Sequence, residues 1–331
     1  MTLRTNIEHP LTSEYHVPSN SKDNRLLVFI PGNPGLIDYY TTYLDLIQQE
    51  FPNMGILALS HAGFQTSDDY VNDGLSRDFE FYNLDYQVAH KCRIIKEHIM
   101  AGNSKLVFLC HSVGGYITQR VISRLLSDED VKDVIEIEFV GLVCPTIVDI
   151  AKSDSGVLFT KLFTYLPIIQ MAVCFLTMLQ WILPDSLART IISKFIIARP
   201  VTDDEKSMES WKNAIDATFK IYKSKRIARQ ALTLAREELQ VIHRDDGMND
   251  WFFEEIPKTH NIQIWCFFAE SDYWVHDNTR DYILSRYHDQ KNKLVSFEIG
   301  ESSTEHTRAI THSFCIDQSV EFAKITCQAL R

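Results

Sequence analysis

The chain of 331 residues has no excess of basic residues: 33 Lys and Arg stand against 44 Asp and Glu, a formal net charge of −11. Because nucleic-acid binding needs a basic surface, we expect no nucleic-acid partner. The seven cysteines are widely spaced and include no C-x-x-C pair. This absence excludes a disulfide or zinc framework and predicts reduced thiols. The first 18 residues are polar, so we expect no secretory signal.

What is present is an alternation of short apolar runs with stretches of helical periodicity. Such runs are typical of buried strands, and strands alternating with helices predict an α/β fold with a mostly parallel sheet and helices on both faces. The strands are expected at 26–30, 55–59, 106–110, 138–144, 262–268 and 294–299. Helices are expected at 39–49 and 83–100, and a final helix is expected after His312-Ser313-Phe314, ending at Leu330. The residues before 26 are interpreted as a polar lead-in.

The strand at 106–110 runs into Cys110-His111-Ser112-Val113-Gly114, which is followed by helical spacing. A serine on a tight strand-to-helix turn matches the G-x-S-x-G nucleophile elbow, with Cys110 replacing the first glycine. The helix N-terminus and the N–H of Val113 would face an oxyanion formed at Ser112. We therefore predict that Ser112 is a nucleophile and Val113 an oxyanion donor, although a purely structural turn would also fit this short motif.

A second predicted oxyanion donor is Asn33, in the loop Pro31-Gly32-Asn33-Pro34-Gly35 after the first core strand. Hydrolases built on this pattern of strands place a second N–H donor in this loop. The alternative is a Pro/Gly turn without chemistry.

An acid and a base follow later core strands. Ser112, Asp272 and His312 stand in the chain order Ser–Asp–His that is typical of the α/β-hydrolase architecture. We expect His312 to move the proton of Ser112 and Asp272 to orient its imidazole. Asp149 is the alternative acid, and His306 is the alternative base.

One long segment lacks charge altogether. No charged residue lies between Lys161 and Asp185, and 17 of the 22 residues in 162–183 are apolar, which is near the length of a membrane span. Pro167 and Pro184 interrupt it, and proline breaks or kinks a helix. Three arrangements fit: a transmembrane helix, a buried cap helix, or a helix–turn–helix that enters one lipid leaflet. We expect core at 1–150, a helical insertion at 151–258 and core again at 259–331.

The motifs PGNPG at 31–35, HAG at 61–63, HSVGGY at 111–116, PTIVDIAKS at 145–153, RDD at 244–246 and HSF at 312–314 resemble those of the lipid droplet-associated serine hydrolases. The resemblance covers residues 26–325. It implies an α/β-hydrolase core, an apolar insertion that targets the droplet monolayer, and a triad that falls on Ser112, Asp272 and His312.

We therefore predict a serine ester hydrolase that acts on neutral lipids, either sterol esters or acylglycerols, at the surface of lipid droplets or the endoplasmic reticulum. The alternatives are a weak or inactive droplet protein that regulates lipid storage, and an acyltransferase that uses the same acyl-enzyme. We expect neither a cofactor nor a metal, and the sequence leaves the oligomeric state open.

Overall fold

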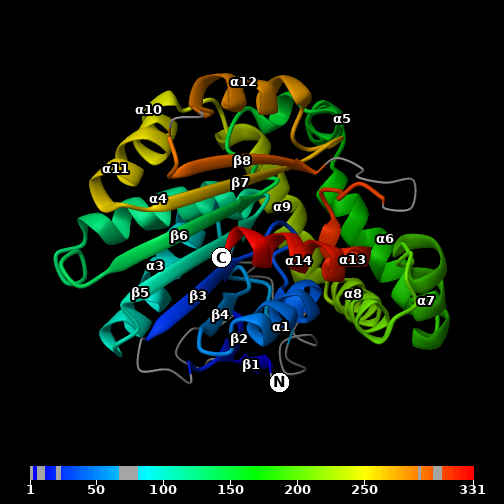
Figure 1. Ribbon diagram of the computed structural model, residues 1–331. Helices are drawn as coiled ribbons and strands as arrows, with labels where there is room; N and C mark the ends of the chain where they lie inside the picture. The colour runs from blue at the N-terminus through cyan, green and yellow to red at the C-terminus, as the bar shows by residue number, and fades with distance from the viewer. Residues whose placement is uncertain (1–2, 6–11, 20–23, 67–80, 290–291, 301–307) are drawn as a thin grey trace.

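The computed structural model describes residues 3–5, 12–19, 24–66, 81–289, 292–300 and 308–331. Its strands form one eight-stranded sheet in the order β1-β2-β4-β3-β5-β6-β7-β8 (Figure 1). The strands are β1 (Leu3–Thr5), β2 (Ser13–Val17), β3 (Arg25–Ile30), β4 (Gly55–Leu59), β5 (Lys105–His111), β6 (Glu136–Val143), β7 (Gln263–Ala269) and β8 (Val295–Gly300).

The six strands from β4 to β8 run parallel, so their carboxyl ends meet at one edge of the sheet. The central strands are buried almost completely, as their continuous apolar runs require in a sheet covered on both faces. Helices α1 and α14 pack together on one face, and α3 and α4 pack together on the other (Figure 1). The predicted α/β class with a mostly parallel sheet is confirmed.

The polar lead-in contains two strands that the sequence pattern did not indicate. β2 pairs antiparallel with the outer side of β4, and β1 pairs antiparallel with β2. The sequence of β2, Ser-Glu-Tyr-His-Val, has only a weak apolar alternation. Main-chain hydrogen bonds to the open edge of β4 supply the pairing, and the side chain of Tyr15 is buried against the core.

The flanking helices begin and end with recognisable signals. The side chain of Asn83 caps α3 by accepting a hydrogen bond from the N–H of Tyr86, and α4 begins directly at the turn after β5. In the described residues, the helices outside the β6–β7 connection are η1 (Ile37–Tyr40), α1 (Thr41–Glu50), α3 (Leu84–Met100), α4 (Val113–Ser127), α12 (Asp277–Tyr287), α13 (Phe314–Asp317) and α14 (Ser319–Ala329).

The connection between β6 and β7 is helical. It contains η2 (Ile150–Lys152), α5 (Asp154–Tyr165), α6 (Ile168–Ile182), α7 (Asp185–Ile191), η3 (Ile192–Ile196), α8 (Glu205–Lys223), α9 (Lys225–Val241), α10 (Asp246–Asp250), η4 (Trp251–Glu255) and α11 (Ile256–His260). We call α5, α6, α7 and η3 the apolar arm. It projects at one side of the molecule, where α6 packs against α9 (Figure 1).

Pro167 lies at the break between α5 and α6, whose axes differ by 88°. Among the described residues no single helix has the length and apolar composition of a membrane span, but the bent α5–α6 pair has them jointly. The arm also exposes large apolar side chains: Tyr165 is 80% exposed, Phe195 81% and Trp181 88%. Such an apolar surface is characteristic of contact with lipid or another protein.

Candidate active site

Ser112 lies on a strained turn between β5 and α4. Its backbone has φ 54° and ψ −123°, a conformation that a residue with a side chain adopts only when its surroundings enforce it. The neighbouring Gly114 permits the turn, because a Cβ there would lie 2.4 Å from the carbonyl oxygen of Ile30 on β3. The glycine that the sequence motif contains is therefore required by the close approach of α4 to the sheet.

Cys110 fills the position where the usual motif has its first glycine. Its thiol is buried and lies 3.4 Å from the carbonyl oxygen of Gly141 on the adjacent β6. Burial raises the pKa of this thiol to about 12, so it is protonated and acts as a small apolar side chain. The departure from the motif is thus accommodated inside the sheet, away from Ser112.

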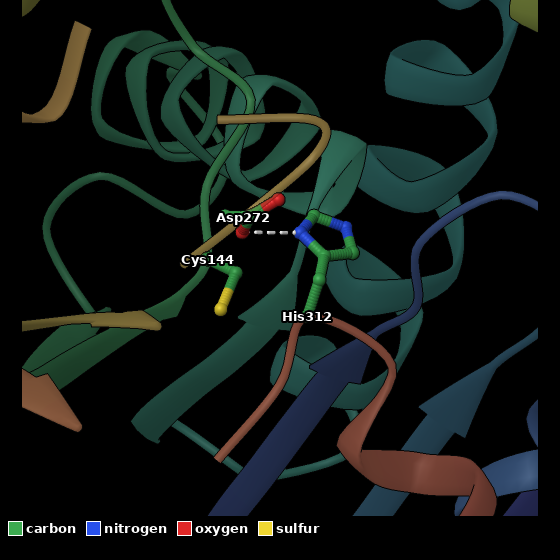
Figure 2. Close-up of side chains that lie close together, drawn as sticks. All are labelled: Cys144, Asp272 and His312. Carbon is green, nitrogen blue, oxygen red and sulfur yellow. Dashed lines mark hydrogen bonds and ion pairs between the residues drawn. The ribbon is translucent and has the colours of Figure 1, made fainter. Parts of the chain in front are cut away.

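The three predicted residues meet at the carboxyl edge of the sheet. The Oγ of Ser112 lies 3.0 Å from Nε2 of His312. On the other side of the ring, Nδ1 of His312 lies 2.7 Å from Oδ2 of Asp272 (Figure 2). A carboxylate can only accept, so Nδ1–H donates to Asp272 and Nε2 can accept from the serine hydroxyl.

Asp272 is held in turn by its own loop. Its Oδ1 accepts hydrogen bonds from the N–H groups of Trp274 at 2.7 Å and Val275 at 3.0 Å. Burial acts to raise the pKa of this carboxyl, but His312 and the two N–H groups outweigh it, so the pKa lies below its usual value. Asp272 is therefore an anion that is already oriented toward the imidazole.

The alternative acid, Asp149, has other partners. Asp149, with a left-handed backbone (φ 46°), pairs with Lys152 at 2.7 Å and accepts from the N–H of Arg244. The structure thus commits Asp149 to partners other than His312. His306 lies outside the described residues, so the choice between it and His312 depends on the contacts that His312 makes.

A network that the sequence did not predict surrounds His111, the residue before Ser112. Its Nε2 donates to the carbonyl oxygen of His312, and its Nδ1 accepts from the hydroxyl of Tyr40, both at 2.8 Å. The N–H of Gly32 donates to the same hydroxyl at 3.3 Å. Burial lowers the pKa of His111 to about 3, so its ring is neutral and joins the elbow, the loop after β3 and the backbone of His312.

The two predicted oxyanion donors flank Ser112. Val113 is the first residue of α4, and a Cβ on Gly32, which precedes Asn33, would lie 3.0 Å from the Cβ of Ser112. Within the described part of the chain, the N–H of Asn33 makes no backbone hydrogen bond in a turn or loop. The N–H of Val113, at the first position of α4, has no carbonyl one turn earlier in its own helix to bind. Both groups are thus available to an oxyanion near Ser112.

A cavity of about 450 Å³ opens onto Ser112 and His312. Its walls come from the loop after β3, from α5, α8 and α9, and from the segment around His312. Most of its surface is apolar, and no lysine or arginine occurs among the described lining residues. Its apolar lining residues include Ile150, Phe159, Ile221, Ala228, Leu232, Trp274 and Ile316.

One group of possible metal ligands occurs in the described residues: Cys144, Asp272 and His312, whose ligand atoms lie within 4.8 Å of one another (Figure 2). Two of these atoms already share a 2.7 Å hydrogen bond. Burial, and to a smaller extent the nearby charge of Asp272, holds the pKa of the Cys144 thiol well above its usual value. A protonated thiol is a poor ligand, so the arrangement fits hydrogen bonding around His312 better than metal binding.

The sequence model of a family described as "Lipid-droplet associated hydrolase" matches residues 23–315. The chain belongs to this family. The chicken lipid droplet-associated hydrolase is 25% identical over 92% of this chain and 84% of its own length, and the mouse protein is 24% identical over 96% and 88%. The resemblance found in the sequence motifs is thereby confirmed.

Solved structures agree with the fold. An ancestral haloalkane dehalogenase superposes with a TM-score of 0.59 at 11% identity, covering all of this chain and 98% of that one. A serine hydrolase from Cycloclasticus zankles superposes with a TM-score of 0.56 at 15% identity, covering 98% and 96%. At such low identity these structures establish the α/β-hydrolase fold alone.

Proposed function

We propose that this hydrolase is a serine carboxylic ester hydrolase whose nucleophile, base and acid are Ser112, His312 and Asp272. The observation that carries the proposal is the continuous pair of contacts, 3.0 Å from Ser112 to His312 and 2.7 Å from His312 to Asp272. Two contacts of this length in this order are what proton transfer from a serine hydroxyl requires.

The reaction proceeds in two halves. Ser112 Oγ attacks the ester carbonyl while Nε2 of His312 takes its proton, and the resulting imidazolium then protonates the departing alcohol. Water attacks the acyl-enzyme by the same route, releases the fatty acid and returns the proton to Ser112. Asp272 stabilises the imidazolium in both halves, and the N–H groups of Val113 and Asn33 stabilise the tetrahedral oxyanion.

The substrate that fits the cavity is the ester of a neutral lipid, either an acylglycerol or a sterol ester. The apolar walls favour hydrocarbon, and the absence of Lys and Arg among the described lining residues disfavours a phosphate or a free carboxylate. The cavity reaches Phe159 on α5, so the apolar arm contributes to its wall.

We further propose that the apolar arm holds the protein on the monolayer of a lipid droplet or on the endoplasmic reticulum membrane, facing the cytosol. Exposed side chains run along the arm: Val157, Leu158, Tyr165, Leu166, Met171, Phe175, Met178, Trp181, Ile182, Leu187, Phe195 and Ile196. Each large apolar side chain that enters lipid contributes roughly 1.5–3 kcal/mol. Of the three arrangements open at the sequence level, the bent α5–α6 pair supports entry into one leaflet.

Activity-based labelling tests the chemistry. The wild-type protein is expected to react with a fluorophosphonate and to hydrolyse tributyrin, and Ser112→Ala is expected to lose both. Ser313→Ala is the matched control, because Ser313 lines the same cavity and has no assigned role, so it retains both activities. Ester hydrolysis by Ser112→Ala at the wild-type rate would contradict the proposal.

A further inference from the structure

Glu238 is a buried carboxyl in the wall of the candidate active-site cavity, on helix α9. Its Oε1 accepts a hydrogen bond of 2.8 Å from the side-chain Nδ2 of Asn33, and the carbonyl oxygen of Ala231 accepts a second one of 3.0 Å. The two hydrogens of the Asn33 amide are thus both bound to α9, about 200 residues away in the chain. Among the described residues, the side chain of Glu238 makes no other hydrogen bond.

We propose that Glu238 is a positioning residue: in its neutral form it holds Asn33, and with it the oxyanion loop, in the geometry needed for ester hydrolysis. The inference rests on the proposed function, because Asn33 acts there through its backbone N–H. A side chain fixed at both hydrogens restricts the rotation of its own backbone, so α9 defines where that N–H points.

The neutrality of Glu238 follows from its surroundings. Burial raises its pKa to about 8, although the hydrogen bond from Asn33 lowers it, and the neighbouring Glu237 raises it further. Above that pH the residue becomes an anion in the same cavity where the oxyanion forms. Like charges in an apolar cavity repel, so ionisation of Glu238 opposes the transition state.

Besides Glu238 and the proposed base His312, the described cavity wall contains four further titratable groups, and none of these four titrates between pH 7 and 10. Burial keeps the pKa values of Tyr39 and Tyr40 above their usual range, raises that of Cys315 to about 12 and lowers that of His111 to about 3. The residues that α5, α8 and the 272–275 loop contribute to the wall carry no titratable group: Phe159, Ile221 and Trp274. Glu238 is therefore the lining group whose ionisation defines the alkaline side of the rate profile.

The hydrogen bonds between Asn33 and α9 also connect two parts of the molecule. Helix α9 packs against both α5 and α6 of the apolar arm, so the helix that holds Asn33 is in contact with the surface that we assign to lipid (Figure 1). A displacement of α9 moves the oxyanion loop directly.

The test measures kcat and KM for tributyrin in a pH-stat between pH 6 and 10, with the full chain. For wild type we expect kcat at pH 9 to be about one tenth of its value at pH 7, since a group with a pKa near 8 is about 90% ionised there. Glu238→Gln still accepts from Asn33 but cannot ionise, so its kcat should be nearly equal at the two pH values. Glu238→Ala should lose about tenfold in kcat at pH 7 with little change in KM.

Glu237→Gln is the matched control, because Glu237 accepts from the N–H of Leu84 and does not line the cavity. It should retain the alkaline decline, displaced to lower pH because the charge of Glu237 no longer raises the pKa of Glu238. A decline in Glu238→Gln that equals the wild-type decline would overturn the inference, even if Glu238→Ala fails to fold. If wild type itself neither hydrolyses tributyrin nor reacts with a fluorophosphonate, it is the proposed function that fails.

Discussion

Side chains in the candidate active site and in the apolar arm differ in their exposure to solvent. At the edge, polar groups such as Ser112, His111 and Asp272 are largely enclosed, and each has a defined hydrogen-bond partner. In the arm, Trp181 and Phe195 are more than 80% exposed although their rings are mainly apolar. The hydrogen bonds of the candidate site are made within one chain, whereas the arm presents an apolar surface to its surroundings.

Because the two regions are distinct, variants can alter ester hydrolysis and lipid binding separately. Changes at the edge should alter kcat and leave lipid binding intact, because they remove hydrogen bonds that only the reaction uses. Changes on the exposed face of the arm should alter partition onto lipid and leave hydrolysis of a dissolved ester intact. Two experiments test whether hydrolysis and lipid binding are separable, and a third tests the turn that presents Ser112. They follow in order of decreasing expected effect.

The largest effect is expected from Asp272→Asn. The amide cannot hold Nδ1–H of His312 as an anion does, so the imidazole loses its tautomer, and kcat should fall by about 10⁴-fold. Steady-state hydrolysis of a soluble short-chain ester measures it. Asp149→Asn, which alters the alternative acid, should change kcat by less than about threefold because Asp149 pairs with Lys152. An equal loss in both variants would refute the assignment of Asp272.

The next effect concerns the arm. The double variant Trp181→Ser, Phe195→Ser removes two exposed apolar side chains, each contributing at least about 1.5 kcal/mol on entering lipid, so partition should fall about 100-fold. Flotation with phosphatidylcholine-coated triolein droplets measures it. Met100→Ser is the control, since Met100 is 65% exposed at the end of α3, outside the arm. Undiminished flotation of the double variant would exclude lipid contact through this face.

The smallest effect tests the turn that presents Ser112. Gly114→Ala would place a Cβ 2.4 Å from the carbonyl oxygen of Ile30, so it should lower the free energy of unfolding by about 1–3 kcal/mol. Gly247→Ala, whose Cβ would meet no atom closer than 3.8 Å, should be neutral or slightly stabilising. Urea denaturation followed by circular dichroism compares them. Equal midpoints for wild type and Gly114→Ala would show that the turn tolerates a side chain.

Local sequence patterns were sufficient for the parallel core and for the elbow. Each core strand is a short apolar run with turn residues after it, and the chain order of Ser112, Asp272 and His312 placed them at one edge. The patterns were insufficient where pairing depends on a distant partner. β2 is recognisable only beside β4, and Glu238 looks like any acid on an amphipathic helix until the fold brings it to Asn33.

The role of His111 could not be predicted from the local sequence either, because its hydrogen-bond partners come from distant segments. A histidine before the serine has two ring nitrogens to satisfy, but the sequence does not say which groups satisfy them. The fold supplies Tyr40 from η1 and the carbonyl oxygen of His312 from a segment about 200 residues away. The signal for this role is the burial of His111 among apolar side chains, which is known only once the chain is folded.

Of the seven cysteines, Cys174 alone is exposed, and it lies on α6 in the middle of the apolar arm. A maleimide should therefore attach there selectively while the protein is folded. A polarity-sensitive dye at that position would change colour when α6 leaves water, so the thiol offers a fluorescent reporter of docking in real time, independent of any enzymatic turnover.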